Sequence, residues 1–335
     1  MMVELMHDSS TPSLVILTAI YNDWVCLPEL LRRIDAELCA IDRAAEVVIV
    51  DDGSTDFSGQ ELLYELSASM ISQIRIVCLL RNLGNQRALA VGIAYLTSEQ
   101  NSCPLLIMDA DHEDDPSYIP LLLSACVEHR DERIVFAGRS KRSEGLFFRF
   151  GYFLFQRFFR LLTGHTISVG NFSIIPQQKI KCVAAIGELW SHYPAAIMRA
   201  RIPIAIVPAQ RAKRYAGKSK MNIVALIVHA LSSLSVHAET IGARILLASS
   251  ALSAIIILSL CSLVGLKLFS DIPMLGWTSQ IAAILLAVLL QLIVASFIMV
   301  FIIVSIRMQP PLVPLREYAN FVGSIKKLSL IRSEQ

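Results

Sequence analysis

Short apolar runs alternate with longer amphipathic segments through the first part of the chain, up to residue 137. The apolar runs are bounded by polar turns, a pattern that predicts buried strands. These runs lie at 14–19, 46–50, 74–80, 104–108 and 133–137. Between them, helical spacing of apolar positions predicts helices at 24–40, 57–68, 86–95 and 118–128. Strands that alternate with helices predict an α/β fold with a mostly parallel sheet, whose ligands bind at the carboxyl ends of the strands.

Two long uncharged stretches follow at 245–266 and 272–306. A helix needs about 20 apolar residues to cross the hydrocarbon core of a bilayer, and both stretches are long enough. Pro273 and Gly276 lie near the start of the second stretch, which places its spanning part at 277–304. The pattern therefore predicts a two-helix transmembrane hairpin rather than two core helices of a soluble protein.

Composition and charge add an orientation to this picture. Hydrophobic residues make up 54% of the chain and charged residues 17%, and the excess of apolar residues is concentrated after residue 220. Basic residues flank the outer ends of the hairpin, whereas only Lys267 marks its connecting loop. The positive-inside rule then places both termini in the cytoplasm, and the opening residues lack the basic start of a signal peptide. We expect a cytoplasmic domain at 1–220, an amphipathic juxtamembrane helix at 221–243, the hairpin at 244–306 and a basic cytoplasmic tail at 307–335.

Acidic residues directly follow two of the predicted strands. Asp51 and Asp52 end the second, and Asp109 and Asp111 follow the fourth, with Glu113 close behind. Residues i and i+2 of an extended stretch point the same way, so the pair at 109 and 111 could hold Mg²⁺ or Mn²⁺ together with substrate phosphates. An acidic D-x-D triplet alone is also common as a solvated turn. The chain has neither G-x-G-x-x-G nor G-x-x-x-x-G-K-[ST], which argues against dinucleotide oxidoreductases and P-loop NTPases.

The order of four motifs gives a resemblance to a known family. They are YND at 21–23, VVIVDDGSTD at 47–56, RNLGNQRAL at 81–89 and MDADHEDDP at 108–116. The chain resembles the family-2 inverting glycosyltransferases of the GT-A (Rossmann-like) fold. With its two C-terminal spans it looks most like the polyisoprenyl-phosphate glycosyltransferase branch, which includes the dolichyl-phosphate mannosyltransferases. The resemblance covers about residues 12–306.

The resemblance implies roles for residues at the matching positions. It implies that the donor is a nucleotide-diphosphate sugar and that one hexose is moved to a polyisoprenyl phosphate lipid. The implied nucleotide-binding residues are Tyr21 and Asp23 for the base, and Asp51 and Asp52 for the base and ribose. Asp109 and Asp111 match the metal and diphosphate acids. The implied loop over the diphosphate contains Arg211, Arg214, Ser219 and Lys220.

The remaining implied site residues concern the acceptor and the metal. Glu113 stands where the family has a neutral Gln, so it could be a further metal ligand or part of a base. Asp114 aligns with the next acid of the family, and Arg139 matches a position implied in binding the acceptor phosphate. A lipid phosphate would need little help from a base, whereas a lipid hydroxyl would need a carboxylate such as Asp114.

Some features depart from the branch and leave alternatives open. The second span ends in the sequence FIIVSIRMQPP, which differs from the usual end of this span in the branch. The sequences GNFS at 170–173 and ELWSHYP at 188–194 also differ from those of the mannosyltransferases. A transferase to a lipid hydroxyl and a non-catalytic nucleotide- or lipid-binding membrane module therefore stay as alternatives. The Q-x-x-R-W signature of processive synthases is absent, which favours one transfer per event.

A basic and aromatic stretch lies at 139–160. On a helix, Arg149, Arg157 and Arg160 fall near one side, which is typical of an interfacial helix that meets anionic headgroups. An aromatic core helix with a solvated basic face is the plainer alternative. Nucleic acid is not expected as a partner, because the adjacent spans explain the composition. The aromatic helix and the hairpin could also pack between subunits of a homo-oligomer.

Overall fold

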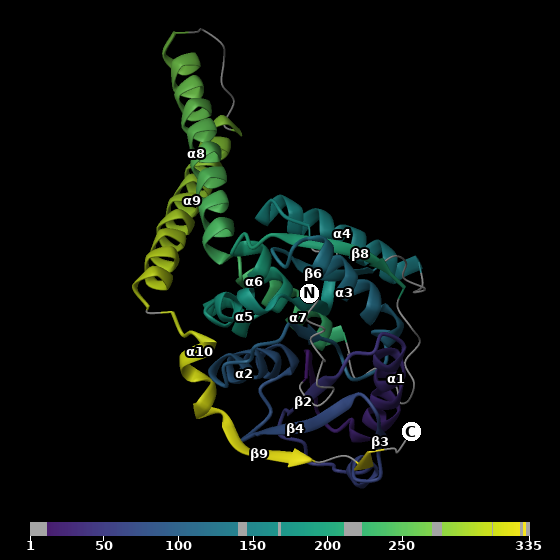
Figure 1. Ribbon diagram of the computed structural model, residues 1–335. Helices are drawn as coiled ribbons and strands as arrows, with labels where there is room; N and C mark the ends of the chain where they lie inside the picture. The colour runs from purple at the N-terminus through teal and green to yellow at the C-terminus, as the bar shows by residue number, and fades with distance from the viewer. Residues whose placement is uncertain are drawn as a thin grey trace. The chain divides into compact units, whose positions relative to one another are not determined.

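The computed structural model describes residues 12–139, 146–166, 169–210, 223–269, 277–309, 311–328 and 331–332 (Figure 1). The chain divides into two compact units. The first unit comprises residues 1–153, 167–236 and 312–335, and the second comprises 154–166 and 237–311. The first unit therefore takes segments from both before and after the long apolar region.

The described residues of the first unit form an eight-stranded sheet in the order β8-β6-β7-β5-β1-β2-β4-β9. The strands are β1 Leu14–Ile20, β2 Ala45–Asp51, β4 Ile71–Leu79, β5 Leu105–Ile107, β6 Ile134–Arg139, β7 Val169–Ile175, β8 Ile204–Ala209 and β9 Val322–Leu328. β5, β1, β2 and β4 are parallel neighbours, as are β6 and β8, whereas β7 and β9 are antiparallel to the strands they pair with. This mixed, mostly parallel sheet confirms the predicted fold class.

Helices cover both faces of the sheet because alternate residues of each strand point to opposite sides. On β1, Leu14 and Ile16 pack with α1 (Leu27–Ala40) and α3 (Ile119–Glu128). Val15 and Leu17 pack on the other face with α2 (Asn85–Ser98), α5 (Gln177–Ala184) and α6 (Tyr193–Arg199). Burial on both faces explains why the strands read as continuous apolar runs.

The predicted helix at 57–68 is wrong. The segment instead holds a short 3₁₀ helix, η2 (Gln60–Leu63), and a two-residue strand, β3 (Ser67–Ala68), which pairs with β10 (Ile331–Arg332). Gly59 adopts a left-handed conformation with φ +88°, and a side chain there would come within 3.0 Å of Val25. The apolar spacing matched a helix, but this backbone turn prevents one.

The segment after the long apolar region returns to the sheet (Figure 1). It forms α10 (Pro314–Glu317), the 3₁₀ helix η5 (Tyr318–Asn320) and β9, which closes the edge beside β4. The Trp190 indole N–H donates to the Leu312 carbonyl at 3.1 Å, and the Trp190 and Phe321 rings lie 5.4 Å apart. The sequence had indicated only a basic tail here. In the structure this segment belongs to the first unit and contributes the edge strand β9 to its sheet.

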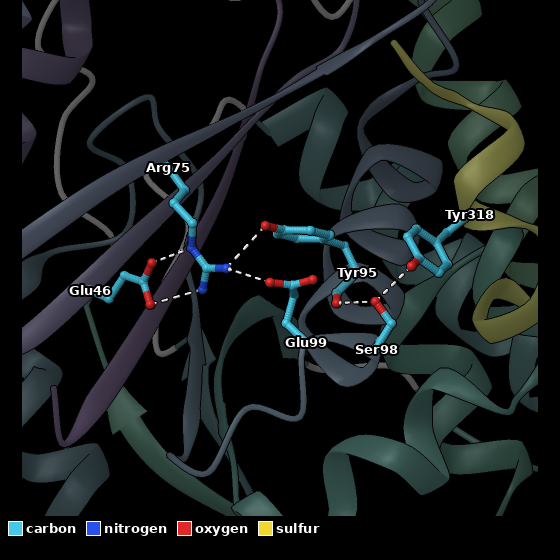
Figure 2. Close-up of polar contacts among 6 residues, drawn as sticks. All are labelled: Glu46, Arg75, Tyr95, Ser98, Glu99 and Tyr318. Atoms are coloured by element: carbon cyan, nitrogen blue, oxygen red, sulfur yellow. Dashed lines mark hydrogen bonds and ion pairs between the residues drawn. The ribbon is translucent and has the colours of Figure 1, made fainter. Parts of the chain in front are cut away.

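A polar network joins β2, β4, α2 and η5 on one face of this edge (Figure 2). Arg75 on β4 forms a two-point ion pair with Glu46 on β2, with Nη2 to Oε2 at 2.8 Å, and donates from Nη1 to the Tyr95 hydroxyl at 3.0 Å. The Tyr318 hydroxyl donates to Ser98 Oγ at 2.7 Å. The returning segment is therefore bound to the C-terminal half of α2 as well as to β4.

The second unit contains two long apolar helices, α8 (Ala238–Phe269) and α9 (Trp277–Met308), which pack against each other. Ser249 Oγ and Ser296 Oγ lie 2.8 Å apart across their interface, and Gly242 lets the helices approach closely beside Met299 and Ile303. Among the described residues, these two helices are long and apolar enough to cross a membrane. At 32 residues each, they are about 48 Å long.

Candidate active site

The loops that carry the predicted site residues meet at one edge of the sheet. β1, β2, β4, β5, β6 and β8 all end there, and the antiparallel β7 begins there. Tyr21 and Asp23 follow β1, Asp51 ends β2, and the segment from Asp109 to Asp114 follows β5. The topology therefore brings the separate motifs of the sequence to a common edge, as the strand pattern predicted.

Asn22 fastens the loop after β1 to the turn after β2. Its side-chain oxygen accepts from the backbone N–H groups of Thr55 at 2.8 Å and Asp56 at 2.9 Å, and its own N–H donates to Ser54 Oγ at 2.9 Å. The motif in the sequence had indicated its neighbours Tyr21 and Asp23 as site residues, but not Asn22. Its left-handed φ of 53° is one that asparagine tolerates better than most residues. A short asparagine between two candidate nucleotide contacts was the available signal.

Asp51 and Asp52 are both buried, at 3% and 2% exposed. Asp51 Oδ1 accepts from the Ser54 N–H at 3.0 Å, which closes the turn. The two carboxylate oxygens of Asp52 accept from the backbone N–H groups of Leu83 at 2.6 Å and Gly84 at 2.8 Å. Burial raises the pKa of the Asp52 carboxyl above its usual value, and those two backbone donors oppose the rise. Asp52 thus holds the start of α2, and its predicted contact with the ribose stays a prediction.

The loop after β5 is folded around its own acids. Asp114 Oδ2 accepts from the Asp109 N–H at 2.9 Å, and Asp111 Oδ1 accepts from the Glu113 N–H at 3.1 Å. Between them, His112 is fully buried with a left-handed φ of 63°, and its Nε2 lies 2.8 Å from the Cys26 carbonyl oxygen. The buried histidine therefore anchors the acidic loop to the backbone of Cys26, at the start of α1.

Side-chain amides converge on Asp109. Asn171 Nδ2 donates to Asp109 Oδ1 at 3.1 Å, and Asn85 Nδ2 lies 3.4 Å from the same oxygen. Because Asn85 directly follows Gly84, which Asp52 holds, the two acidic turns are linked through the start of α2. Asn85 and Asn171 lie in motifs recognised in the sequence, RNLGNQRAL and GNFS, but neither residue was expected to have a role.

A small cavity of about 20 Å³ lies beside Asp114. It is lined by Glu113, Asp114, Asp115, Ala137, Gly138, Gly170, Phe172, Ala209 and Gln210. Asp115 is held in place by an ion pair with Arg33 at 2.7 Å. Arg139 ends β6 at this edge, although its side chain lies outside the described part of the structure. Arg211, Arg214, Ser219 and Lys220 also lie outside the described residues.

The ligand atoms that Asp109 and Asp111 can offer fit a hard divalent cation. Both offer carboxylate oxygens, and the side-chain amides of Asn85 and Asn171 contact the Asp109 carboxylate at hydrogen-bond distance. Within the described ranges, no three His, Cys, Asp or Glu side chains gather as a metal site. Mg²⁺ commonly takes one or two carboxylates and completes its shell with substrate phosphates, so two aspartates suffice. The role of Glu113 as a third ligand stays a prediction.

The sequence of the chain was compared with those of known protein families. A model described as Glycosyl transferase family 2 matches residues 15–183, which is half of the chain. The chain belongs to glycosyl transferase family 2. All four motifs of the sequence lie inside the matched region, so the resemblance that they predicted is confirmed.

Curated members of family 2 share part of their length with this chain. The undecaprenyl-phosphate 4-deoxy-4-formamido-L-arabinose transferase of Klebsiella pneumoniae subsp. pneumoniae is 32% identical over 145 residues, which cover 43% of this chain and 42% of that protein. The protein of the same name from Salmonella paratyphi A is 33% identical over 128 residues, covering 38% and 37%. The chain thus matches less than half the length of these relatives.

A solved structure shares the fold of this family 2 domain. Glucosyl-3-phosphoglycerate synthase from Mycobacterium tuberculosis, in complex with Mn²⁺, UDP-glucose and phosphoglyceric acid, superposes with a TM-score of 0.50 at 14% identity. The superposition covers 70% of this chain and 81% of that chain. At this identity the likeness concerns the fold alone, and it agrees with the GT-A architecture.

Proposed function

We propose that this chain is a membrane-bound inverting glycosyltransferase that moves one sugar from a nucleotide-diphosphate sugar to a polyisoprenyl phosphate on the cytoplasmic face. The observation that carries the proposal is the joining of two acidic turns, at Asp51–Asp52 and Asp109–Asp111, at one edge of a family 2 sheet. The names of the curated relatives describe transfer to undecaprenyl phosphate. A pair of long apolar helices in the same chain supports a lipid acceptor.

In this mechanism the donor lies over the carboxyl ends of β1, β2 and β5. Tyr21, Asp23 and Asp51 contact the base and ribose. A contact between Asp52 and the nucleotide would be additional to the two hydrogen bonds that Asp52 accepts from the backbone of Leu83 and Gly84. Asp109 and Asp111 would hold a divalent cation, Mg²⁺ or Mn²⁺, which would neutralise charge on the departing diphosphate. The diphosphate-binding loop proposed from the sequence contains Arg211, Arg214, Ser219 and Lys220.

The acceptor attacks the anomeric carbon from the face opposite the diphosphate, so that the configuration inverts. A lipid phosphate is already anionic at neutral pH and needs little help from a base. Arg139, at the end of β6, would orient it through charge-assisted hydrogen bonds.

Exposed apolar side chains on two shorter helices support contact with a bilayer surface. On α4 (Leu146–Thr163), Phe153, Leu154, Phe158 and Leu161 are all exposed, as are Ile227, Val228 and Leu231 on α7 (Ile223–Ser235). Arg157 and Arg160 of α4 are exposed as well. Such helices would hold the transfer site near the lipid headgroups.

The test is an assay in membranes with a panel of radiolabelled UDP- and GDP-sugars, followed by extraction of the lipids. We expect one donor to label a lipid whose sugar is released by mild acid, which marks a sugar phosphodiester. Asp111→Ala should remove metal-dependent turnover. Full activity of that variant would contradict the metal assignment, and a wild-type protein that labels no lipid with any donor would overturn the proposed function.

A lipid hydroxyl is the second candidate acceptor, and the position of Asp114 favours it. Asp114 is 8% exposed and lines the small cavity, where a general base would be needed. Asp114→Asn keeps an oxygen for the Asp109 N–H but removes the charge. We expect this variant to abolish transfer to a hydroxyl, by about 100-fold or more, and only to weaken transfer to a phosphate. An acid-stable product together with this loss would establish the hydroxyl acceptor.

A non-catalytic module is the remaining alternative. It predicts that the wild-type chain binds a nucleotide yet neither hydrolyses nor transfers any nucleotide sugar. Nucleotide binding measured beside the transfer assay separates this alternative from the proposed enzyme.

A further inference from the structure

A chain of side-chain amides leads from the backbone of α6 to Asp109. The Tyr193 N–H donates to Gln86 Oε1 at 2.7 Å, and Gln86 Nε2 donates to Asn171 Oδ1 at 3.1 Å. Asn171 Nδ2 then donates to Asp109 Oδ1 at 3.1 Å. The three linked side chains come from α2, from β7 and from the loop after β5.

The direction of every bond in this chain follows from its first member. A backbone N–H can only donate, so the Gln86 atom that faces it must be the carbonyl oxygen. The amide group of Gln86 then faces Asn171, which must present its own oxygen. Asn171 is left with its NH₂ group toward Asp109. One fixed donor in the backbone therefore guarantees a donor at the carboxylate.

Both ends of the chain are held rigidly. Asn171 is 7% exposed, and its backbone carbonyl oxygen accepts from Ser173 Oγ at 2.9 Å. Ser173 Oγ also lies 2.8 Å from the Tyr193 hydroxyl, and both residues are fully buried. The first donor and the last amide are thus tied to each other by a second route through the core.

We propose that Gln86 and Asn171 are positioning residues, which form an amide relay that orients the Asp109 carboxylate toward the divalent cation of the transferase site. The relay holds Oδ1 by a hydrogen bond and leaves Oδ2 for the metal. Neither amide has to touch the substrate. The inference rests on the proposed function, because it takes Asp109 as a metal ligand.

Two substitutions of Gln86 separate orientation from folding. Gln86→Glu still accepts from the Tyr193 N–H but, when ionised, cannot donate to Asn171. The Asn171 amide must then turn its NH₂ group toward the introduced carboxylate and its oxygen toward Asp109, which repels the Asp109 carboxylate. Gln86→Met removes both bonds without reversing the relay, and it leaves the Tyr193 N–H without its acceptor. A purely structural role predicts that Gln86→Met is the worse variant in every measurement.

The relay predicts opposite orders for metal binding and for stability. Mn²⁺ binding is measured by the loss of the free-ion electron paramagnetic resonance signal, on the full chain in detergent at about pH 8, where carboxylates are ionised, with UDP or GDP present. Thermal unfolding is followed on the same samples. We expect Gln86→Glu to bind Mn²⁺ about tenfold more weakly than wild type, with Gln86→Met between them. The melting temperature should fall in the order wild type, Gln86→Glu, Gln86→Met.

Gln177→Glu is the matched control, because it places the same charge on an exposed position at the start of α5, and it should match wild type in both measurements. Wild-type Mn²⁺ affinity in Gln86→Glu, or the same order of variants in both measurements, would overturn the relay. Absence of Mn²⁺ binding by the wild-type chain would overturn it too. Sugar transfer by the wild-type chain is measured separately, so failure of the relay and failure of the proposed function remain distinguishable.

Discussion

At the scale of single residues, Gly53 has the least room for change in the acidic turn. Its φ is +69°, and a Cβ atom there would lie 2.7 Å from the backbone carbon of Arg81. The clash is with backbone rather than with a flexible side chain, so the segment between β4 and α2 would have to move. That segment carries the N–H groups that hold Asp52.

Gly53→Ala should therefore lower the free energy of unfolding by about 1–3 kcal/mol and weaken nucleotide binding together with it. Chemical denaturation and nucleotide titration in detergent measure the two effects. Gly265→Ala is the control, since a Cβ atom there meets nothing within 4 Å. Equal unfolding midpoints for both variants would contradict the steric argument.

The sequence located the acids of the site but not the groups that hold them. Charged residues at strand ends are visible as a pattern, and Asp51, Asp109 and Asp111 lie where that pattern placed them. Gln86 and Asn171 act through bonds to residues distant in the chain. Their partners are determined only when the sheet brings the loops together, so no local spacing could indicate them.

At the scale of elements, the ion pair between Glu46 and Arg75 links the side chains of β2 and β4 (Figure 2). The two side chains are only 10% and 11% exposed. Arg75→Met would leave the Glu46 carboxylate buried without its partner, which costs about 3–5 kcal/mol. We expect the double variant Glu46→Leu with Arg75→Met to recover most of that loss, because it buries no unpaired charge.

Arg32→Met is the matched control for the ion pair. Its side chain is 61% exposed and lies 3.4 Å from Glu29 on the same helix, and such exposed pairs contribute less than about 1 kcal/mol. Unfolding midpoints of the wild type and the three variants in denaturant give the comparison. If Arg75→Met were no less stable than Arg32→Met, the buried pair would not be what joins these strands.

The sequence predicted β1, β2, β4, β5 and β6 from their apolar runs, whereas β7, β8 and β9 were not predicted. The sequence of β9, VGSIKKL, carries two exposed lysines on an edge strand, which is how edge strands commonly avoid pairing with other chains. The same lysines read as a basic tail in the sequence. The helix expected at 57–68 failed for the opposite reason, since its spacing was helical but Gly59 turns the backbone.

At the scale of the whole molecule, the sheet constrains the proposed membrane topology. Its strands β1, β2 and β4 to β8 precede the hairpin, and β9 follows it. A chain that crosses a bilayer and then contributes to a sheet begun before the crossing must return to the side that it left. The hairpin must then cross an even number of times, in agreement with two spans.

This topology can be tested by cysteine labelling in a variant whose exposed Cys39, Cys182 and Cys261 are replaced by alanine. Lys267→Cys, near the end of α8, should react with a membrane-impermeant maleimide on intact cells. Lys326→Cys, on β9, should react only after the cells are permeabilised. Reaction of both positions under the same condition would contradict a hairpin that crosses the bilayer.

The pairing of β4 with β9 also sets an order of events during synthesis. β4 emerges from the ribosome early, yet the strand that covers its edge is made only after both apolar helices have been translated. Chains fold from the N-terminus as they are made, and unpaired strand edges are prone to aggregation. Synthesis of both helices therefore has to precede completion of the sheet. A nascent chain that stalls at the membrane would keep an open edge, which chaperones and proteases could recognise as unfinished.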